Sequence, residues 1–156
     1  MNVDVIIKHH DLEIPIKFEL EKNKPHVIDV GEEQFADRLF AVLCGLEDIK
    51  FSDDVLGLGD KTMFVNGTIY KNIYKVLRIR FPRKESKEKT EQVIELYKLD
   101  GKKKIKSLSD SELYEVALAR SYYRQPELVV INKNGYLSDV EIDVSRWDDC
   151  YVVCIH

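Results

Sequence analysis

The sequence has few cysteines, and their number and spacing exclude a disulfide-based fold. Three cysteines occur among 156 residues, so they cannot all pair within the chain. Cys150 and Cys154 lie four positions apart on a predicted strand, which separates their Cα atoms by about 13 Å, too far for a disulfide. We expect reduced, buried thiols.

Long apolar runs and a basic leader are also missing. No segment has about 18 consecutive apolar residues, which argues against a membrane span. The N-terminus, Met1-Asn-Val-Asp-Val5, has neither basic residues nor a long apolar stretch, so no signal peptide is expected and the predicted location is the cytoplasm. The net charge of −4 at pH 7 disfavours general binding to nucleic acid, which needs a basic surface.

The C-terminal part of the sequence predicts the centre of a β-sheet. Leu128–Ile131 and Tyr151–Ile155 are apolar at consecutive positions, which is typical of strands covered on both faces. Between them Leu137–Val144 alternates between apolar and polar residues, which predicts a third strand. Asn134-Gly135 is typical of a tight hairpin turn leading into that strand.

The N-terminal part predicts a hairpin, and two segments predict amphipathic helices. Val3–Lys8 and Leu12–Leu20 alternate and turn at His9-His10-Asp11, and His26–Val30 adds a short strand. The helices are expected to begin at capping boxes and to pack on the sheet. The first predicted helix covers Gly31–Leu46 and has its capping box at Asp29–Glu32. The second opens at the capping box Ser109–Glu112 and runs to about Arg124.

The middle of the chain predicts further hairpins, because Asn66-Gly67 and Asp100-Gly101 are tight-turn signals. The predicted strands are Thr62–Val65, Thr68–Phe81, Gln92–Leu99 and Lys102–Leu108, with loops at Phe51–Lys61 and Arg83–Glu91. Tight turns join antiparallel strands. The predicted fold is therefore α+β: a single domain, residues 1–156, with one mainly antiparallel mixed β-sheet built from hairpins and two amphipathic α-helices packed on it.

A basic strand face is the candidate binding surface. On the predicted strand Thr68–Phe81, one alternation carries Tyr70, Tyr74, Arg78 and Arg80. Arginines interleaved with tyrosines on a sheet suit nucleic-acid backbones and stacked bases. Trp147, the one tryptophan, is a candidate anchor for a partner. The alternative is a charged sheet face balanced by neighbouring glutamates.

A row of carboxylates is the candidate metal and catalytic site. Asp139, Glu141 and Asp143 project from one face of the predicted strand Leu137–Val144, and carboxylate oxygens suit Mg²⁺. Glu85, in the predicted loop, is expected to reach such a site. The alternative is a solvated strand face without metal.

Two other patterns are weaker. Cys154 and His156 point the same way on a strand, and His9-His10 would complete a zinc shell, but paired Cys-x-x-Cys spacing is absent. Gly57-Leu-Gly-Asp-Lys-Thr62 has the residue types of a phosphate loop without the Gly-x-x-x-x-Gly-Lys spacing, so no nucleotide site is expected there.

These observations predict a non-catalytic binding or regulatory protein, such as an inhibitor or accessory factor, acting through a protein or nucleic-acid surface without a cofactor. The alternative is a metal-dependent nuclease or other phosphodiester-acting enzyme that uses Mg²⁺ on the carboxylates. The sequence does not decide whether the partner is a protein or a nucleic acid. No binding to a membrane is expected. The two strands that are apolar on both faces are also compatible with a homodimer.

Overall fold

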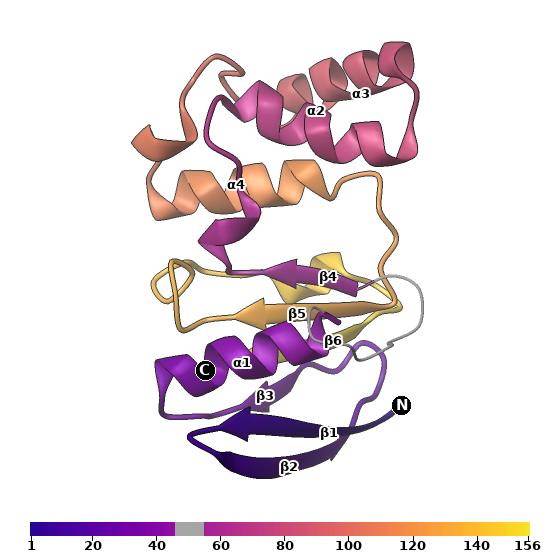
Figure 1. The fold of residues 1–156 in the computed structure, drawn as a ribbon. Coiled ribbons are helices and arrows are strands. Elements are labelled where there is room, and N and C mark those ends of the chain that lie inside the picture. Colours follow the sequence, from indigo (N-terminus) through magenta and orange to yellow (C-terminus); the bar gives the residue numbers. More distant parts are fainter. Residues whose placement is uncertain (46–54) are drawn as a thin grey trace. The chain divides into compact units, whose positions relative to one another are not determined.

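The fold is described from a computed structural model, which describes residues 1–45 and 55–156 (Figure 1). The chain divides into two compact units. Unit 1 comprises Met1–Asp60 and Gln125–His156, and unit 2 comprises Lys61–Arg124. Within the described ranges, none of the helices combines the length and apolar character that crossing a membrane requires.

Unit 1 begins with the predicted hairpin. Strands β1 (Asn2–His9) and β2 (Leu12–Glu19) pair antiparallel, with Asn2 opposite Glu19 and His9 opposite Leu12. Side chains of β1 are buried at every second position, as its alternation predicts. The two-residue turn between the strands has positive φ at both positions, 48° at His10 and 61° at Asp11, which is typical of tight hairpins.

The second sheet of unit 1 is parallel, which corrects the predicted antiparallel architecture. Its four strands are ordered β3-β6-β5-β4, and each neighbouring pair is parallel. The strands are β3 (His26–Ile28), β4 (Val55–Leu58), β5 (Leu128–Asn132) and β6 (Tyr151–Ile155). The prediction of strands at β3, β5 and β6 is confirmed, and all five residues of β5 are buried.

Two predictions in unit 1 are wrong. Leu137–Val144 is not a strand but a series of turns that ends in the 3-10 helix η3 (Val144–Arg146), so Asn134-Gly135 does not join a hairpin. The predicted loop Phe51–Lys61 contains β4, while residues 51–54 lie outside the described ranges. Short turns do not exclude a parallel sheet when long segments between its strands provide the crossovers.

Helix α1 (Glu33–Leu43) lies between the hairpin and the parallel sheet (Figure 1). It confirms the predicted amphipathic helix, although Leu46 lies outside the described residues and Glu32, not Asp29, is the N-cap. One buried apolar cluster joins hairpin, helix and sheet. It comprises Val3, Val5, Ile7, Leu20, Ala36, Leu39, Phe40, Val42, Leu43, Leu128, Val130, Val153 and Ile155. The sheet also approaches α1 closely, since a Cβ on Gly57 would lie 2.8 Å from the Phe40 ring.

Unit 2 is helical where strands were predicted. Its helices are α2 (Ile69–Arg80), α3 (Arg83–Leu96) and α4 (Asp110–Arg120), with short 3-10 helices η1 (Lys61–Met63) and η2 (Ile105–Ser107). The predicted strands Thr62–Val65, Thr68–Phe81, Gln92–Leu99 and Lys102–Leu108 are therefore wrong, as is the loop Arg83–Glu91. Only α4 and its Ser109–Glu112 capping box were predicted correctly in this unit.

Helix α2 forms because its start is held by side-chain and tertiary hydrogen bonds. Thr68 is the N-cap, and its hydroxyl accepts a hydrogen bond from the amide of Lys71. The next two amides, of Ile69 and Tyr70, donate to the carbonyls of Lys103 and Gly101. The amide groups that every helix leaves unpaired at its start are thus satisfied by another part of the unit.

Candidate functional site

The carboxyl ends of the parallel strands are the expected place for a ligand in a sheet of this kind. At the end of β5, however, the buried Asn132 binds other protein groups. Its amide nitrogen donates to Asp37 Oδ1 at 3.0 Å, and its Oδ1 accepts from the Asn134 amide at 3.0 Å. Gly59, with φ of 117°, lies against the carbonyl of Asn132. Protein atoms therefore occupy this part of the edge.

The turn after β5 also directs its polar groups inward. Lys133 Nζ donates to the carbonyl of Val140 at 2.6 Å, and the Lys133 amide donates to Ile155 at the end of β6. Asn134 donates to the same Ile155 carbonyl at 3.3 Å. A lysine at the strand ends is a usual phosphate ligand, but this ammonium group is bound to the backbone.

The connection from β3 to α1 is the place where a phosphate-binding loop would lie, between a strand and the helix that follows it. It has four residues, Asp29 to Glu32, and ends in an acidic N-cap followed by Glu33. The motif Gly-x-x-x-x-Gly-Lys-Ser/Thr occurs nowhere in the sequence. Carboxylates repel phosphates, so the residues of this connection do not fit a nucleotide triphosphate.

Instead, this connection meets the β1–β2 turn. Glu32 Oε1 lies 3.2 Å from His9 Nε2 and 3.4 Å from His10 Nε2. The two imidazoles, His9 first and His10 second, hold the pKa of the Glu32 carboxyl below its ordinary value of 4.5. The sequence indicated the histidine pair as metal ligands but not Glu32, because a glutamate just before a helix is typical of a capping box.

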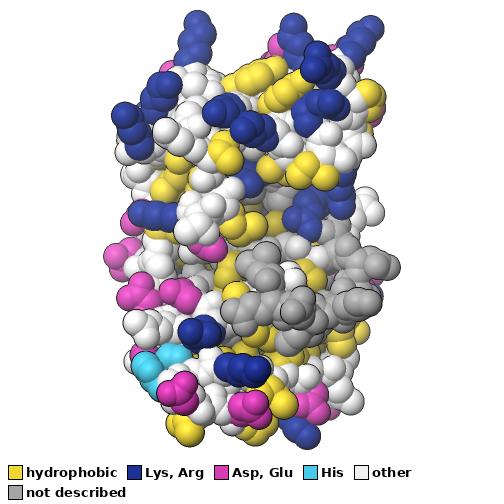
Figure 2. Space-filling model, in the orientation of Figure 1, with side chains coloured by type: hydrophobic (Ala, Val, Ile, Leu, Met, Phe, Trp, Pro, Cys, Tyr) yellow, Lys and Arg dark blue, Asp and Glu magenta, His cyan; other side chains and the backbone are white. Residues whose placement is uncertain are grey.

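The predicted basic residues lie on a helix and not on a strand face. Tyr70, Tyr74 and Arg78 follow one another at intervals of four on α2, so they share one side of it. The two tyrosine rings stack with centroids 5.9 Å apart, and burial raises the pKa of Tyr70. Arg80 projects from a different side of α2. Figure 2 shows lysine and arginine side chains gathered over the helical unit, and binding through these residues stays a prediction.

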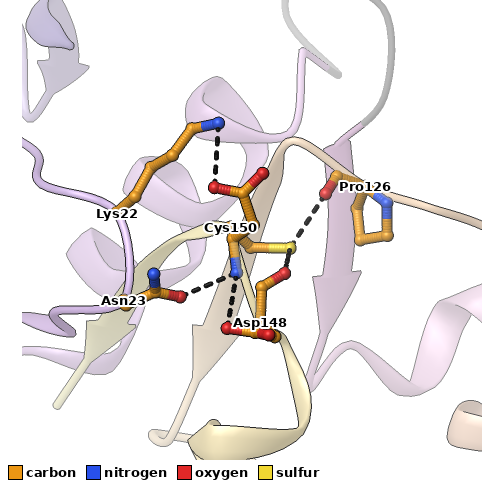
Figure 3. Close-up of polar contacts among 6 residues, drawn as sticks. Lys22, Asn23, Pro126, Asp148 and Cys150 are labelled. Carbon is orange, nitrogen blue, oxygen red and sulfur yellow. Dashed lines mark hydrogen bonds and ion pairs between the residues drawn. The ribbon is translucent and has the colours of Figure 1, made fainter.

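Trp147 is buried in unit 1, with 9% of its surface exposed, which does not suit an exposed anchor. It lines a cavity of about 250 Å³ together with Asn23, Pro25 and Asp148. Hydrogen bonds join the segments around it (Figure 3). Asn23 Oδ1 accepts from the amide of Asp149 at 2.7 Å, and the Cys150 thiol donates to the Pro126 carbonyl at 3.0 Å. These hydrogen bonds join the segments beside the cavity, and binding through Trp147 stays a prediction.

The predicted carboxylates do not converge. Asp139, Glu141 and Asp143 are exposed and follow a turn instead of sharing a strand face. Asp143 accepts from the Ser145 hydroxyl and amide, which lowers the pKa of Asp143. Glu85 lies on α3, in unit 2, and pairs with Lys89 at 3.8 Å. Among the described residues, the one potential metal-ligand cluster is His9, His10 and Glu32.

The comparisons with known proteins concern the fold. No family model matches the chain. The structure is similar to cbiO1 from Clostridium perfringens, part of the ABC transporter complex cbiONQ, with a TM-score of 0.64 and 11% identity over 99% of this chain and 76% of that one. It is also similar to the dimeric MJ0796, a bacterial ABC transporter cassette, with a TM-score of 0.65 and 12% identity over 99% of this chain and 85% of that one.

This likeness overturns the predicted function. The sequence predicted a non-catalytic binding or regulatory protein with a basic strand face at Tyr70 to Arg80, or a nuclease with a carboxylate strand face at Asp139 to Asp143. The structure has a helix at Tyr70 to Arg80 and turns at Asp139 to Asp143, and the two solved structures above, which are similar to it in fold, belong to ABC transporters. The fold of this chain is that of ABC transporter cassettes.

Proposed function

We propose that the protein is a cassette-type subunit of a nucleotide-driven transporter, located in the cytoplasm, where it pairs with a second cassette that carries a phosphate-binding loop. The observation that supports this proposal most strongly is the extent of the fold likeness. The match to two transporter cassettes covers 99% of this chain, so it includes the helical unit 2 as well as the sheet.

We include a second cassette because, within residues 1–45 and 55–156, the positions where nucleotide phosphates are expected do not suit them. A phosphate loop surrounds phosphates with backbone amides and adds a lysine. Here the β3–α1 connection is only four residues long and has Asp29 and Glu32 at its two ends. The nearby Lys133 is bound to Val140. The triphosphate is therefore expected to bind to the partner cassette.

The first test is binding of Mg²⁺-ATP to the purified full chain by calorimetry, together with an assay of phosphate release. We expect neither saturable binding nor hydrolysis, because the carboxylates of the β3–α1 connection disfavour an anion. A matched variant, Glu32→Gln with Asp29→Asn, checks whether these two charges alone prevent binding. Tight binding by the unmodified chain would contradict the proposed division of roles.

The second test is the composition of the assembly. The tagged chain, cross-linked in its native cells and purified, is expected to be joined to a protein whose sequence contains a phosphate-binding loop and that matches the cassette fold. Sedimentation of the chain alone measures the competing arrangement. A stable homodimer that is not joined to such a cassette would contradict the mixed pair and favour the homodimer that the sequence allowed.

A further inference from the structure

The side chains of His9, His10 and Glu32 converge on one point of unit 1, although the residues come from two separate segments. His9 ends β1, His10 begins the β1–β2 turn, and Glu32 is the N-cap of α1. Adjacent strand residues normally point to opposite faces. The left-handed backbone of His10, with φ of 48°, brings the two imidazole rings to 4.0 Å between centroids.

The two distances from the Glu32 carboxylate to the histidine nitrogens are close to those of a tetrahedral metal site. Zinc binds imidazole nitrogen and carboxylate oxygen at about 2.0 to 2.1 Å, so two ligand atoms of a tetrahedron lie about 3.3 to 3.4 Å apart. Glu32 Oε1 lies 3.2 Å from His9 Nε2 and 3.4 Å from His10 Nε2. All three ligand atoms lie within 4.8 Å of one another.

The burial of His9 is a second observation that points to a ligand at this cluster. The residue is 7% exposed, and its Nε2 is buried without a hydrogen-bond partner among the described residues. Glu32 Oε1 lies 3.2 Å from this nitrogen, at ion-pair distance. A buried nitrogen without a partner is unfavourable, whereas its lone pair is a good metal ligand. The edge of the ring packs against Phe35 of α1, with centroids 5.5 Å apart, which orients it.

Glu32 is also positioned as a ligand instead of as a cap. An N-cap side chain usually accepts a hydrogen bond from its own helix, but Glu32 makes no such bond. Its carboxylate points to the two histidines. Figure 2 shows histidine side chains at the surface of the protein beside acidic and basic ones.

We propose that His9, His10 and Glu32 bind a divalent transition metal ion of the zinc type, through the two Nε2 atoms and one carboxylate oxygen. Two imidazoles favour such ions, whereas Mg²⁺ and Ca²⁺ prefer oxygen ligands. Both histidines and Arg38 are among the residues that line a surface cavity of about 580 Å³, so we expect water to take the fourth position of the metal. This inference does not depend on the proposed cassette role.

The test is zinc binding to the full chain after chelator treatment and dialysis, measured by competition with a fluorescent zinc chelator. We expect one ion per chain. His10→Ala and Glu32→Gln change exposed residues and are each expected to weaken binding by more than about tenfold, since even a lost second-shell contact has effects of that size. Circular dichroism checks that both variants fold. Mg²⁺ in large excess is not expected to compete.

The control is His156→Ala, which removes another exposed imidazole. It is expected to leave zinc affinity unchanged, and Co²⁺ in the unmodified chain is expected to give a tetrahedral spectrum without a thiolate charge-transfer band. Unchanged affinity in both His10→Ala and Glu32→Gln would overturn the proposal. The proposal would also be overturned if the Co²⁺ spectrum of the unmodified chain showed a thiolate charge-transfer band that the His156→Ala variant lacked. That result would place the metal at Cys154 and His156.

Discussion

The interior of unit 1 and the interior of unit 2 are stabilised by different kinds of contact. In unit 1 the backbone comes close to other groups, with Gly57 against Phe40 and Gly59 against the carbonyl of Asn132. In unit 2, buried polar side chains bind the backbone, as Asn72 does at Val65 and Thr90 does at Ser86. Unit 1 is therefore expected to be sensitive to added volume, and unit 2 to the loss of a hydrogen-bonding group.

The largest effect is expected from Gly59→Ala in unit 1. The residue has φ of 117°, which an alanine rarely adopts, and its Cβ would collide with the backbone carbonyl of Asn132. The free energy of unfolding should fall by about 3 kcal/mol or more, from strain and overpacking together. Urea unfolding measures the loss, and hydrogen exchange should rise first in β4 and β5.

The matched control for this substitution is Gly31→Ala. Gly31 also has positive φ, 68°, but a Cβ there would meet no atom within 4 Å. Only the backbone strain remains, which is about 1 kcal/mol. Equal losses in the two variants would contradict the explanation by close approach at Gly59.

A smaller effect is expected from Asn72→Ala in unit 2. Asn72 is 2% exposed, and its side chain binds the amide and carbonyl of Val65 and the carbonyl of Thr68. Its loss should lower the free energy of unfolding by about 2 kcal/mol, because these backbone groups lose their partner. The exposed Asn66→Ala is the control, with almost no effect. If amide hydrogen exchange in the Asn72→Ala variant rose as much in unit 1 as in unit 2, the two units would not be stabilised separately.

The smallest effect concerns Glu112, the acidic half of the α4 capping box. Its pKa is lowered from the ordinary 4.5, first by Lys103 and then by Ser109. Because the folded pKa is the lower one, the stabilisation is present above pH 4.5 and is lost as pH falls through the folded value. Glu112→Gln should therefore slightly flatten the acid side of the curve of unfolding free energy against pH, which urea unfolding at a series of pH values measures. Identical curves would contradict this prediction.

The errors of prediction are concentrated in unit 2 for a physical reason. The segment Ile69–Arg80 is rich in β-branched and aromatic residues, which favour strands locally. Its buried apolar residues Ile69, Ile73 and Leu77 recur every four positions, which fits one face of a strand as well as one side of a helix, and the fourth buried residue, Asn72, is polar. Helix α3 is equally hard to predict from its sequence, because its buried side includes Ser86 and Thr90. Polar residues that are satisfied by the backbone do not appear as a core in a hydrophobic pattern.

The candidate site was predictable only in part. The histidine pair at the hairpin turn was visible in the sequence, and its turn was placed correctly. Glu32 was not visible as its neighbour, since the sequence separates it from His10 by 22 positions. The alternation of Asp139, Glu141 and Asp143 predicts a shared strand face, but no strand is present there to align them.

The sequence by itself determined the elements with strong local signals: the alternating hairpin β1–β2, the apolar strands β5 and β6, and helices α1 and α4. Tertiary structure alone decided that the sheet is parallel and that α2 and α3 are helices. The reason is that strand direction depends on where the long crossovers lead, and that the first amides of α2 find their partners at Gly101 and Lys103, some thirty residues away in the sequence.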